Sequence, residues 1–335
     1  MAFRFRTNES APAGFRRLAI SQISRARRQL AEGQDHGVAV HEARKSLKRV
    51  RALLRLVRPA LSDEQYRREN ARFRDIGRML SASRDRQVMR ETVASLASDA
   101  IPQQQKALHA LAEVLSKDLE NGSDAVADQS VALAIAALDE AKKDIKGKSL
   151  HFRIKDPLPL GMKRSYKSGQ RALAAAKTQP DDETLHDWRK TVQAHWRHAL
   201  LLSEAWPAYF TVRANLAKEL SDLLGADHDL AVLITFVQSG DGNVIGTRHA
   251  ELIAALASAR QQELRAKAFA NGKLLFADDA KELAERVKRY RAIAADQIQA
   301  VTDVDIQETE PSASPDEVNV SSVSSRALAK RVAVS

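Results

Sequence analysis

The amino-acid sequence predicts an all-α protein made of two similar helical bundles, and three observations lead to this class. Apolar residues recur at the 3.6-residue period of a helix, and no segment alternates apolar and polar residues as a strand does. Three landmarks also occur twice, in the same order and about 145 residues apart. They are a Pro-x-Gly sequence at Pro12 and Pro159, a histidine-led basic segment at His41 and His186, and the turns at 80–85 and 224–229. A constant offset of this kind indicates a duplicated unit.

The first half divides into six expected helices. Pro12 lies near the start of the first and Gly33 just past its end, while Pro59 ends the second. Asp63 and Glu64 begin the third, where acidic side chains suit the positive end of a helix. The expected ranges are 12–32, 37–58, 62–80, 83–96, 102–119 and 124–145.

The second half repeats this scheme after a linker at 146–158, which contains Lys-Gly-Lys and Asp-Pro-Leu-Pro. Its expected helices are 159–178, 181–204, 207–225, 228–238, 248–270 and 276–300. We therefore place repeat one at about 11–146 and repeat two at about 158–300. We expect residues 1–10 to be flexible, and the acidic, Ser-rich segment 301–335 to be disordered.

The charge of the chain is concentrated near its start. The 335 residues carry a formal net charge of +10, and residues 1–60 hold 14 Lys/Arg against 4 Asp/Glu. This distribution indicates a local site for an anionic ligand rather than a uniformly basic protein. The chain has no cysteine, which excludes disulfides, thiolate metal sites and cysteine nucleophiles. Its start lacks the apolar core of a signal peptide, and no segment reads as a membrane span, so we expect a cytoplasmic protein.

The first histidine-led segment has two parallel stripes. Basic residues recur at intervals of 3-4-3-4-3 at His41, Arg44, Lys48, Arg51, Arg55 and Arg58. One position earlier, an apolar stripe follows the same spacing at Val40, Ala43, Leu47, Val50, Leu54 and Val57. On a helix the stripes lie about 100° apart, so burial of the apolar one leaves the basic one at the edge of the core, facing a groove or channel. A row of like charges destabilises a helix by roughly 0.2–0.5 kcal/mol per pair, and we expect an anionic ligand to compensate.

The pattern H-x-x-R-x-x-x-K-R-x-R in two helical repeats resembles the CHAD family (conserved histidine α-helical domain) over about residues 10–300. The first copy matches through His41, Arg44, Lys48, Arg49 and Arg51. The second keeps His186 and Arg189, adds Lys190, and departs from the pattern at Gln193 and Ala194. The resemblance implies two pseudo-symmetric four-helix bundles around a basic central groove or pore. It also implies binding of inorganic polyphosphate and, for some members, association with polyphosphate granules.

A polyphosphate chain carries a row of negative charges and has no nucleobases to recognise, so a protein that binds it needs a row of cationic hydrogen-bond donors. Arg supplies a planar fork for phosphate, Lys a point charge, and His one or two N–H donors according to its protonation, which a nearby phosphate favours. The expected polyphosphate-binding residues are Arg16, Arg17, His41, Arg44, Lys45, Lys48, Arg49, Arg51, Arg55, Lys163, Arg164, Tyr166, Lys167, His186, Arg189, Lys190 and Arg197. We expect the first repeat to dominate binding, because the second has Gln193, Ala194 and Trp196 where the first has cations.

Two alternatives remain at this stage. A basic groove attracts any polyanion, including nucleic acid, but single-strand binders add exposed aromatic platforms, and the tryptophans are expected in the core. A metal site is the second alternative, because His195 and His198 are three residues apart and 227–229 reads Asp-His-Asp. The cations around His41 and His186 disfavour a divalent ion, and His195 falls on an apolar stripe, which predicts a buried structural histidine.

The sequence does not predict an enzyme. It contains no phosphate-binding loop and none of the serine-hydrolase or zinc-protease motifs. Asp85 and Asp229 occupy equivalent positions, and each is expected to open a helix, where capping explains it. We therefore expect a polyanion-binding protein without cofactor, metal or membrane partner.

Overall fold

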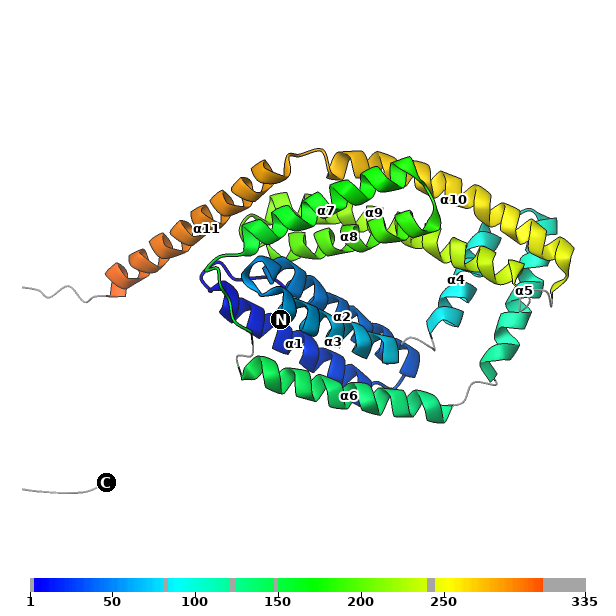
Figure 1. Cartoon of the computed structure of the whole chain (residues 1–335), viewed down its shortest axis with the longest axis horizontal. Coiled ribbons are helices and arrows are strands. Elements are labelled where there is room, and N and C mark those ends of the chain that lie inside the picture. The colour runs from blue at the N-terminus through cyan, green and yellow to red at the C-terminus, as the bar shows by residue number, and fades with distance from the viewer. Residues whose placement is uncertain (1–2, 81–83, 121–123, 148–149, 240–244, 310–335) are drawn as a thin grey trace, which may run out of the picture.

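The computed structural model describes residues 3–80, 84–120, 124–147, 150–239 and 245–309. Within these ranges the chain forms eleven α-helices and one 3-10 turn and contains no strand, which confirms the all-α class (Figure 1). The helices are α1 (Ala11–Glu32), α2 (His36–Val57), α3 (Asp63–Met79), α4 (Arg84–Ser98), α5 (Pro102–Glu120), α6 (Asp124–Lys146), α7 (Leu158–Thr178), α8 (Asp182–Leu201), α9 (Pro207–Gln238), α10 (Thr247–Leu275) and α11 (Ala280–Thr309), with the 3-10 turn at Arg58–Ala60.

Side-chain caps fix the starts of several helices. The Asp35 carboxylate accepts a hydrogen bond from the Val38 N–H at 3.0 Å and begins α2, and Asp181 does the same for Thr184 at the start of α8 (2.8 Å). At α3, Ser62 and Gln65 form a reciprocal capping box. The two helices that carry the repeated motif therefore start at matching acidic caps.

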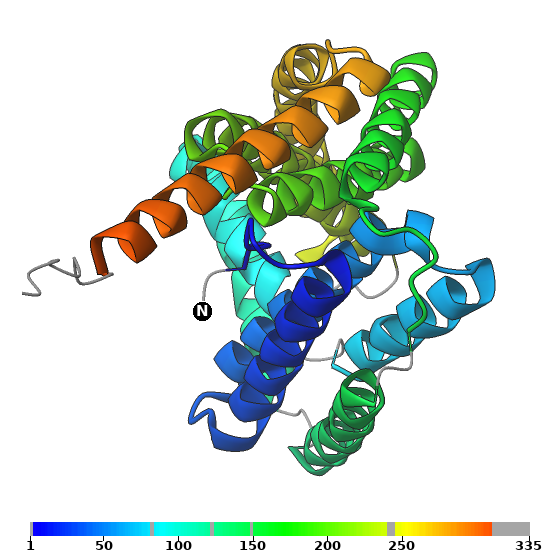
Figure 2. The same ribbon diagram turned by 90° about the vertical axis from the view of Figure 1, so that its left-hand side faces the viewer.

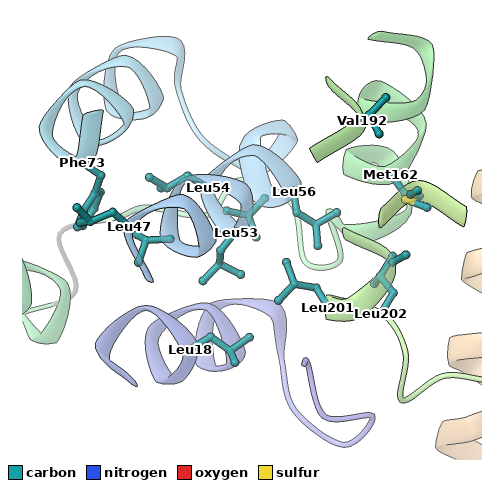
Figure 3. Close-up of a cluster of buried hydrophobic side chains, with 14 of the residues drawn as sticks. Leu18, Leu47, Leu53, Leu54, Leu56, Phe73, Met162, Val192, Leu201 and Leu202 are labelled. Carbon is teal, nitrogen blue, oxygen red and sulfur yellow. The ribbon is translucent and has the colours of Figure 1, made fainter. Parts of the chain in front are cut away.

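The helices form two groups that meet along α2. One group contains α1, α2, α3 and α6, and the other contains α7, α8, α9 and α10, with α11 packed on α7 (Figures 1 and 2). Helices α4 and α5 pack on each other and against α9 and α10. Because α2 contacts both α7 and α8, the two groups share one hydrophobic core, which Figure 3 shows in part. Leu56 from α2 lies in that core with Met162 from α7 and Leu201 from the end of α8.

A second core lies at the other end of α9. Val93 of α4 and Leu108 and Leu111 of α5 pack there with Leu233 of α9 and Ile253 of α10. The long helix α9 therefore spans both cores and holds the α4–α5 pair in place. None of the described helices carries an apolar stretch sufficient to cross a bilayer.

The observed elements differ from the expected ones in two places. Residues 207–225 and 228–238 form one continuous helix, α9, so Asp229 lies inside a helix and does not open one. Gly225 lowers helix propensity by only about 1 kcal/mol, and packing on both sides outweighs it. Helix α11 continues to Thr309, so 301–309 are helical where disorder was expected, and 310–335 lie outside the described residues.

The N-terminal segment, expected to be flexible, is packed from residue 3 onward, whereas residues 1–2 lie outside the described part. The Phe5 side chain is buried, and the Phe5 N–H donates to the Leu201 carbonyl at 2.9 Å. Arg4 pairs with Glu204 at 3.1 Å, and Arg17 donates to the Arg4 carbonyl at 2.9 Å. These contacts tie the start of the chain to the end of α8.

The repeated landmarks lie at corresponding helices. Pro12 and Pro159 each stand in the first turn of a helix, and His41 and His186 lie in α2 and α8. The first of the paired turns includes 81–83, outside the described residues. The duplication and the central pore stay predictions.

The two groups approach each other closely at Gly161 of α7. A Cβ atom added there would lie 1.7 Å from the Leu56 carbonyl oxygen of α2. Only a residue without a side chain allows α7 to cross α2 at this distance. At Gly77 of α3, by contrast, an added Cβ would meet only Leu47, at 3.9 Å.

We therefore expect Gly161→Ala to lower the free energy of unfolding by about 1–3 kcal/mol or more, because the backbones must separate. Gly77→Ala, the matched control, should raise it by about 0.4–1 kcal/mol through a less flexible unfolded chain. Urea denaturation of both variants measures the two effects. Equal stability of the variants would contradict the close-approach argument.

Candidate functional site

A cavity of about 500 Å³ opens between α2 and α8, with α4 and α9 along its sides. We call it the basic pocket. Its lining contains seven Lys/Arg side chains, two histidines and one acid, so its charge is strongly positive. The lining residues are Arg44, Lys48, Arg51, Ala52, Arg55, Val88, Met89, His186, Arg189, Lys190, Gln193, Ala194, Arg197, His228, Asp229 and Val232.

Helix α3 anchors two of the guanidinium groups that α2 presents. Arg44 donates from Nη1 to the carbonyls of Gly77 (3.1 Å) and Leu80 (2.9 Å), where α3 ends. Arg51 donates from Nε to Asn70 at 3.1 Å. Each guanidinium has five N–H donors, so this anchoring is compatible with contacts to a phosphate. The anchors limit the rotamer freedom of both side chains.

Helix α8 presents its cations from the opposite wall. Arg197 donates to the Gln193 carbonyl at 2.8 Å, and its guanidinium lies 5.0 Å from the centre of the Trp196 ring. Arg189 lies against α9, where a Cβ added at Gly225 would come within 3.2 Å of its Nη2 atom. The absence of a side chain at Gly225 therefore leaves room for this guanidinium.

Burial and mutual repulsion destabilise the charged forms of the cationic side chains in the pocket. Burial lowers the pKa of Arg51, and the charge of Arg55 adds to the effect. Burial also lowers the pKa of Arg197 to about 10, with further contributions from Arg49 and Arg55. These groups stay protonated at neutral pH, but the direction of the shifts shows that the charged forms are destabilised. An anion in the pocket would offset that destabilisation.

Two histidines form a pair on the α8–α9 side of the pocket. The ring centres of His186 and His228 are 4.3 Å apart. Burial, together with the charges of His228, Lys190 and Arg189, lowers the pKa of His186 to about 4. Burial and Arg189 also lower the pKa of His228. Nδ1 of His186 is buried without a hydrogen-bond partner among the described residues, so this ring nitrogen is not committed to a described protein group.

Eight of the residues predicted from the sequence lie together in the basic pocket: Arg44, Lys48, Arg51, Arg55, His186, Arg189, Lys190 and Arg197. Within the described part of the chain, the other nine lie outside its lining: Arg16, Arg17, His41, Lys45, Arg49, Lys163, Arg164, Tyr166 and Lys167.

Several of these nine have structural partners instead. Arg17 pairs with Glu9, and Lys45 pairs with Glu42 at 2.6 Å. Arg49 donates to Gln22 at 3.3 Å. Lys163 lines a separate, smaller cavity of about 260 Å³ between α7 and α11. The half-buried His41 belongs to α2 but not to the described lining.

Tyr166 requires a correction. Its side chain is fully buried, and its hydroxyl oxygen accepts a hydrogen bond from the Asp278 N–H at 2.8 Å. Burial raises its pKa to about 12. A side chain in the core cannot serve as the exposed phosphate contact expected from its basic neighbours, and we leave it out of the site.

Sequence reasoning missed His228 and Asp229 as lining residues, although it singled out 224–229 as a repeated landmark. It also placed all tryptophans in the core. Trp188 is fully buried, but Trp206 is 45% exposed and lies between α8 and α9, after the second motif.

The described residues give no support to a metal site, since no three His, Asp or Glu side chains among them are grouped to hold an ion. His195 and His198 are fully buried, the former as predicted. Nε2 of His198 lies 2.9 Å from the Ala52 carbonyl oxygen, and burial lowers the pKa of His198 to about 3. Both histidines therefore belong to the core.

Comparison with protein-family models matches the CHAD domain over residues 16–238, which contain every lining residue of the basic pocket. No curated protein matches the chain. Among solved structures, PptA from Streptomyces chartreusis is similar, with a TM-score of 0.49 and 13% identity over 80% of this chain and 98% of PptA. Because the family match covers about two thirds of the 335 residues, the chain belongs to the CHAD family.

Proposed function

We propose that the chain binds inorganic polyphosphate in the basic pocket and neither cleaves nor extends it. The observation that carries the proposal is the arrangement of α2 and α8, which present four and three Lys/Arg side chains to one cavity. A polyphosphate chain carries roughly one negative charge per unit, and it would contact both walls at once. Membership of the CHAD family supports the same ligand.

The shape of the cationic surface favours an extended anion over a single phosphate. From Arg44 to Arg55, α2 advances about 16 Å at 1.5 Å per residue. Arg51 and Arg55 continue the row, and Arg197 approaches Arg55 from α8. One phosphate group could not contact all of these side chains, whereas a flexible chain of phosphates could lie along them.

Nucleic acid is the alternative polyanion. The described lining of the pocket contains no Phe, Tyr or Trp on which a base could stack. Binding of DNA or RNA would then depend on the phosphate backbone alone and would be non-specific. The exposed Trp206 does not change this, because it lies outside the lining.

We further propose a cytoplasmic location and association with polyphosphate granules, which rests on the family resemblance. A fluorescent fusion expressed in cells that store polyphosphate tests this part of the proposal. Diffuse fluorescence in granule-containing cells would contradict it.

We expect the double variant Lys48→Gln, Arg55→Gln to weaken binding to polyphosphate roughly 10- to 100-fold, because two charge-assisted contacts are lost. Among the described residues, the side-chain hydrogen bonds from α2 to α3 and its end come from Arg44 and Arg51 instead. Lys45→Gln is the matched control, because Lys45 lies on the same helix outside the pocket, and its affinity should stay within about twofold. Fluorescence anisotropy with labelled polyphosphate provides the measurement.

In the same assay, we expect the double variant Lys190→Gln, Arg197→Gln to lose less affinity for polyphosphate than Lys48→Gln, Arg55→Gln does, if the first repeat dominates binding. Affinity should increase with chain length and fall steeply with salt, and DNA should compete only weakly. Equal losses in the two double variants would refute the dominance of α2. Tighter binding of DNA than of polyphosphate would refute the proposed ligand.

We expect affinity to rise as the pH falls from 7 to 5, by up to roughly tenfold. In the free protein His186 has a pKa of about 4, and a bound anion raises it, so binding takes up a proton. The gain therefore appears as the pH falls through the raised pKa and levels off near pH 4. His186→Gln should remove part of the gain, whereas His151→Gln, at an exposed position outside the pocket, should keep it.

Circular dichroism at each pH must accompany this measurement. The pKa values of His195 and His198 are lowered by burial, so the fold loses stability as the pH falls below about 6.5. An affinity that is independent of pH in a protein that remains folded would contradict the role of His186.

Incubation with polyphosphate and magnesium should leave the chain-length distribution unchanged on a gel and release no phosphate. The physical reason is that binding residues are abundant, whereas no metal-holding cluster is found among the described residues. Shortened product that disappears in the Lys48→Gln, Arg55→Gln variant would show the protein to be an enzyme.

A further inference from the structure

Helix α10 contacts both histidine-bearing helices, α8 and α9, through Arg265. The Arg265 guanidinium donates from Nε to the Asp227 carboxylate of α9 at 2.6 Å. It also donates from Nη2 to the Asp182 carboxylate at the start of α8 (2.7 Å) and from Nη1 to the Pro180 carbonyl (3.0 Å). We call these contacts the Arg265 bridge. Arg265 lies beyond residues 16–238, which the family model matches, and is not part of the described pocket lining.

The Arg265 bridge is largely buried and differs from a surface ion pair. The side chain of Asp227 is only 3% exposed, and that of Arg265 is 21% exposed. Gln261, one turn before Arg265 on α10, is buried and donates from Nε2 to the Asp227 carbonyl at 3.0 Å. A buried carboxylate that loses its cation is strongly destabilised. The planar guanidinium serves three acceptors at once, which the point charge of a lysine does not reproduce.

The bridge lies where the buried apolar residues between α9 and α10 are interrupted. On α9 the buried residues of the first core end at Leu224, and those of the second core begin at Leu230. On α10 the second core ends at Leu264, and the first resumes at Ala268. The bridge residues of both helices lie between these positions. Hydrogen bonds therefore take over from apolar contacts in joining the helices at this level.

The histidine pair of the pocket lies next to the bridge. His186 follows Asp182 by four residues on α8, so the two side chains share one face of that helix. His228 directly follows Asp227 on α9. The two rings, whose centres are 4.3 Å apart, therefore depend on the spacing that the bridge maintains. Both histidines line the pocket, whereas the bridge residues do not belong to its described lining.

We propose that Arg265 is a positioning residue of the basic pocket. It joins Asp182 to Asp227, keeps α8 and α9 at a fixed spacing, and thereby holds both histidine rings toward one stretch of bound anion. Without the bridge the rings separate, and only one of them contacts that stretch. The inference rests on the polyphosphate binding proposed above, and it assigns a role in that site to a helix outside the family match.

Charged groups from four helices surround the histidine pair, and Arg265→Lys leaves their number and sign unchanged. They are Asp182, Asp187, Arg189 and Lys190 from α8, Asp227 and Asp229 from α9, Arg265 from α10 through the bridge, and Arg44 and Lys48 across the pocket on α2. The described lining from α4 is uncharged. This variant therefore tests the geometry of the bridge and not its charge.

Nuclear Overhauser effects between the two imidazole rings test the proposal in the free, histidine-labelled protein. With ring centres 4.3 Å apart, the wild-type chain should show contacts between the ring protons of His186 and His228. Arg265→Lys should abolish them, because one ammonium group does not hold all three acceptors. Arg260→Lys is the matched control and should keep them, since Arg260 lies on the same helix and pairs with Glu263 of that helix at 2.6 Å.

Affinity for polyphosphate provides the second measurement. Arg265→Lys should weaken binding roughly three- to tenfold, but it should have no further effect in a His186→Gln background, because both changes remove the same paired contact. A bridge that only stabilised the fold would give equal losses in both backgrounds. Asp182→Asn removes only the arm whose side chain is 60% exposed, so it should show the same pattern with smaller losses. It replaces Arg265→Lys if that variant does not fold.

Ring contacts that survive both Arg265→Lys and Asp182→Asn would overturn the proposal. Absence of the contacts in the wild-type chain would do so too, as would equal losses of affinity in the two backgrounds. Failure of the wild-type chain to bind polyphosphate would instead refute the proposed function, and the ring contacts would then still decide whether Arg265 positions the pair.

Discussion

The packing of α2 against α7 and α8 is the constraint on which the rest of the structure depends. It buries the apolar stripe of α2, including Leu53, Leu54 and Leu56, in a core shared by both helix groups. The basic stripe on the same helix is thereby brought opposite the cations of α8. Hydrophobic burial thus gathers like charges that would otherwise separate. Gly161 makes this possible, because it lets the α7 backbone approach the Leu56 carbonyl.

The sequence predicts the α2 wall of the pocket well and the α8 wall less directly. Helical spacing alone places four cations of α2 on one face of that helix, and all four line the pocket: Arg44, Lys48, Arg51 and Arg55. The contribution of α9 could not be predicted, because it depends on how α9 crosses α8 and not on a pattern within either helix. His228 therefore came to light only in three dimensions, where it pairs with His186.

Tyr166 shows how a local charge pattern misleads. Its basic neighbours Lys163 and Lys167 suggested an exposed position, but Met162, Tyr166, Gly169 and Leu173 follow a 4-3-4 spacing and form the buried face of α7. Periodicity was the stronger signal there. At α9 the turn expected at 224–229 is absent, because packing on both sides keeps the helix continuous.

The docking of the N-terminal segment on the end of α8 has a consequence for biosynthesis. Phe5 donates its N–H to the carbonyl of Leu201, and Thr7 donates its N–H to Glu204 at 3.1 Å. The partners of these first residues are therefore translated almost 200 positions later. At about 5–20 residues per second, the ribosome needs roughly 10–40 s to supply them. During that interval Phe5 remains without its final apolar environment, so the N-terminal segment cannot dock until α8 has been synthesised.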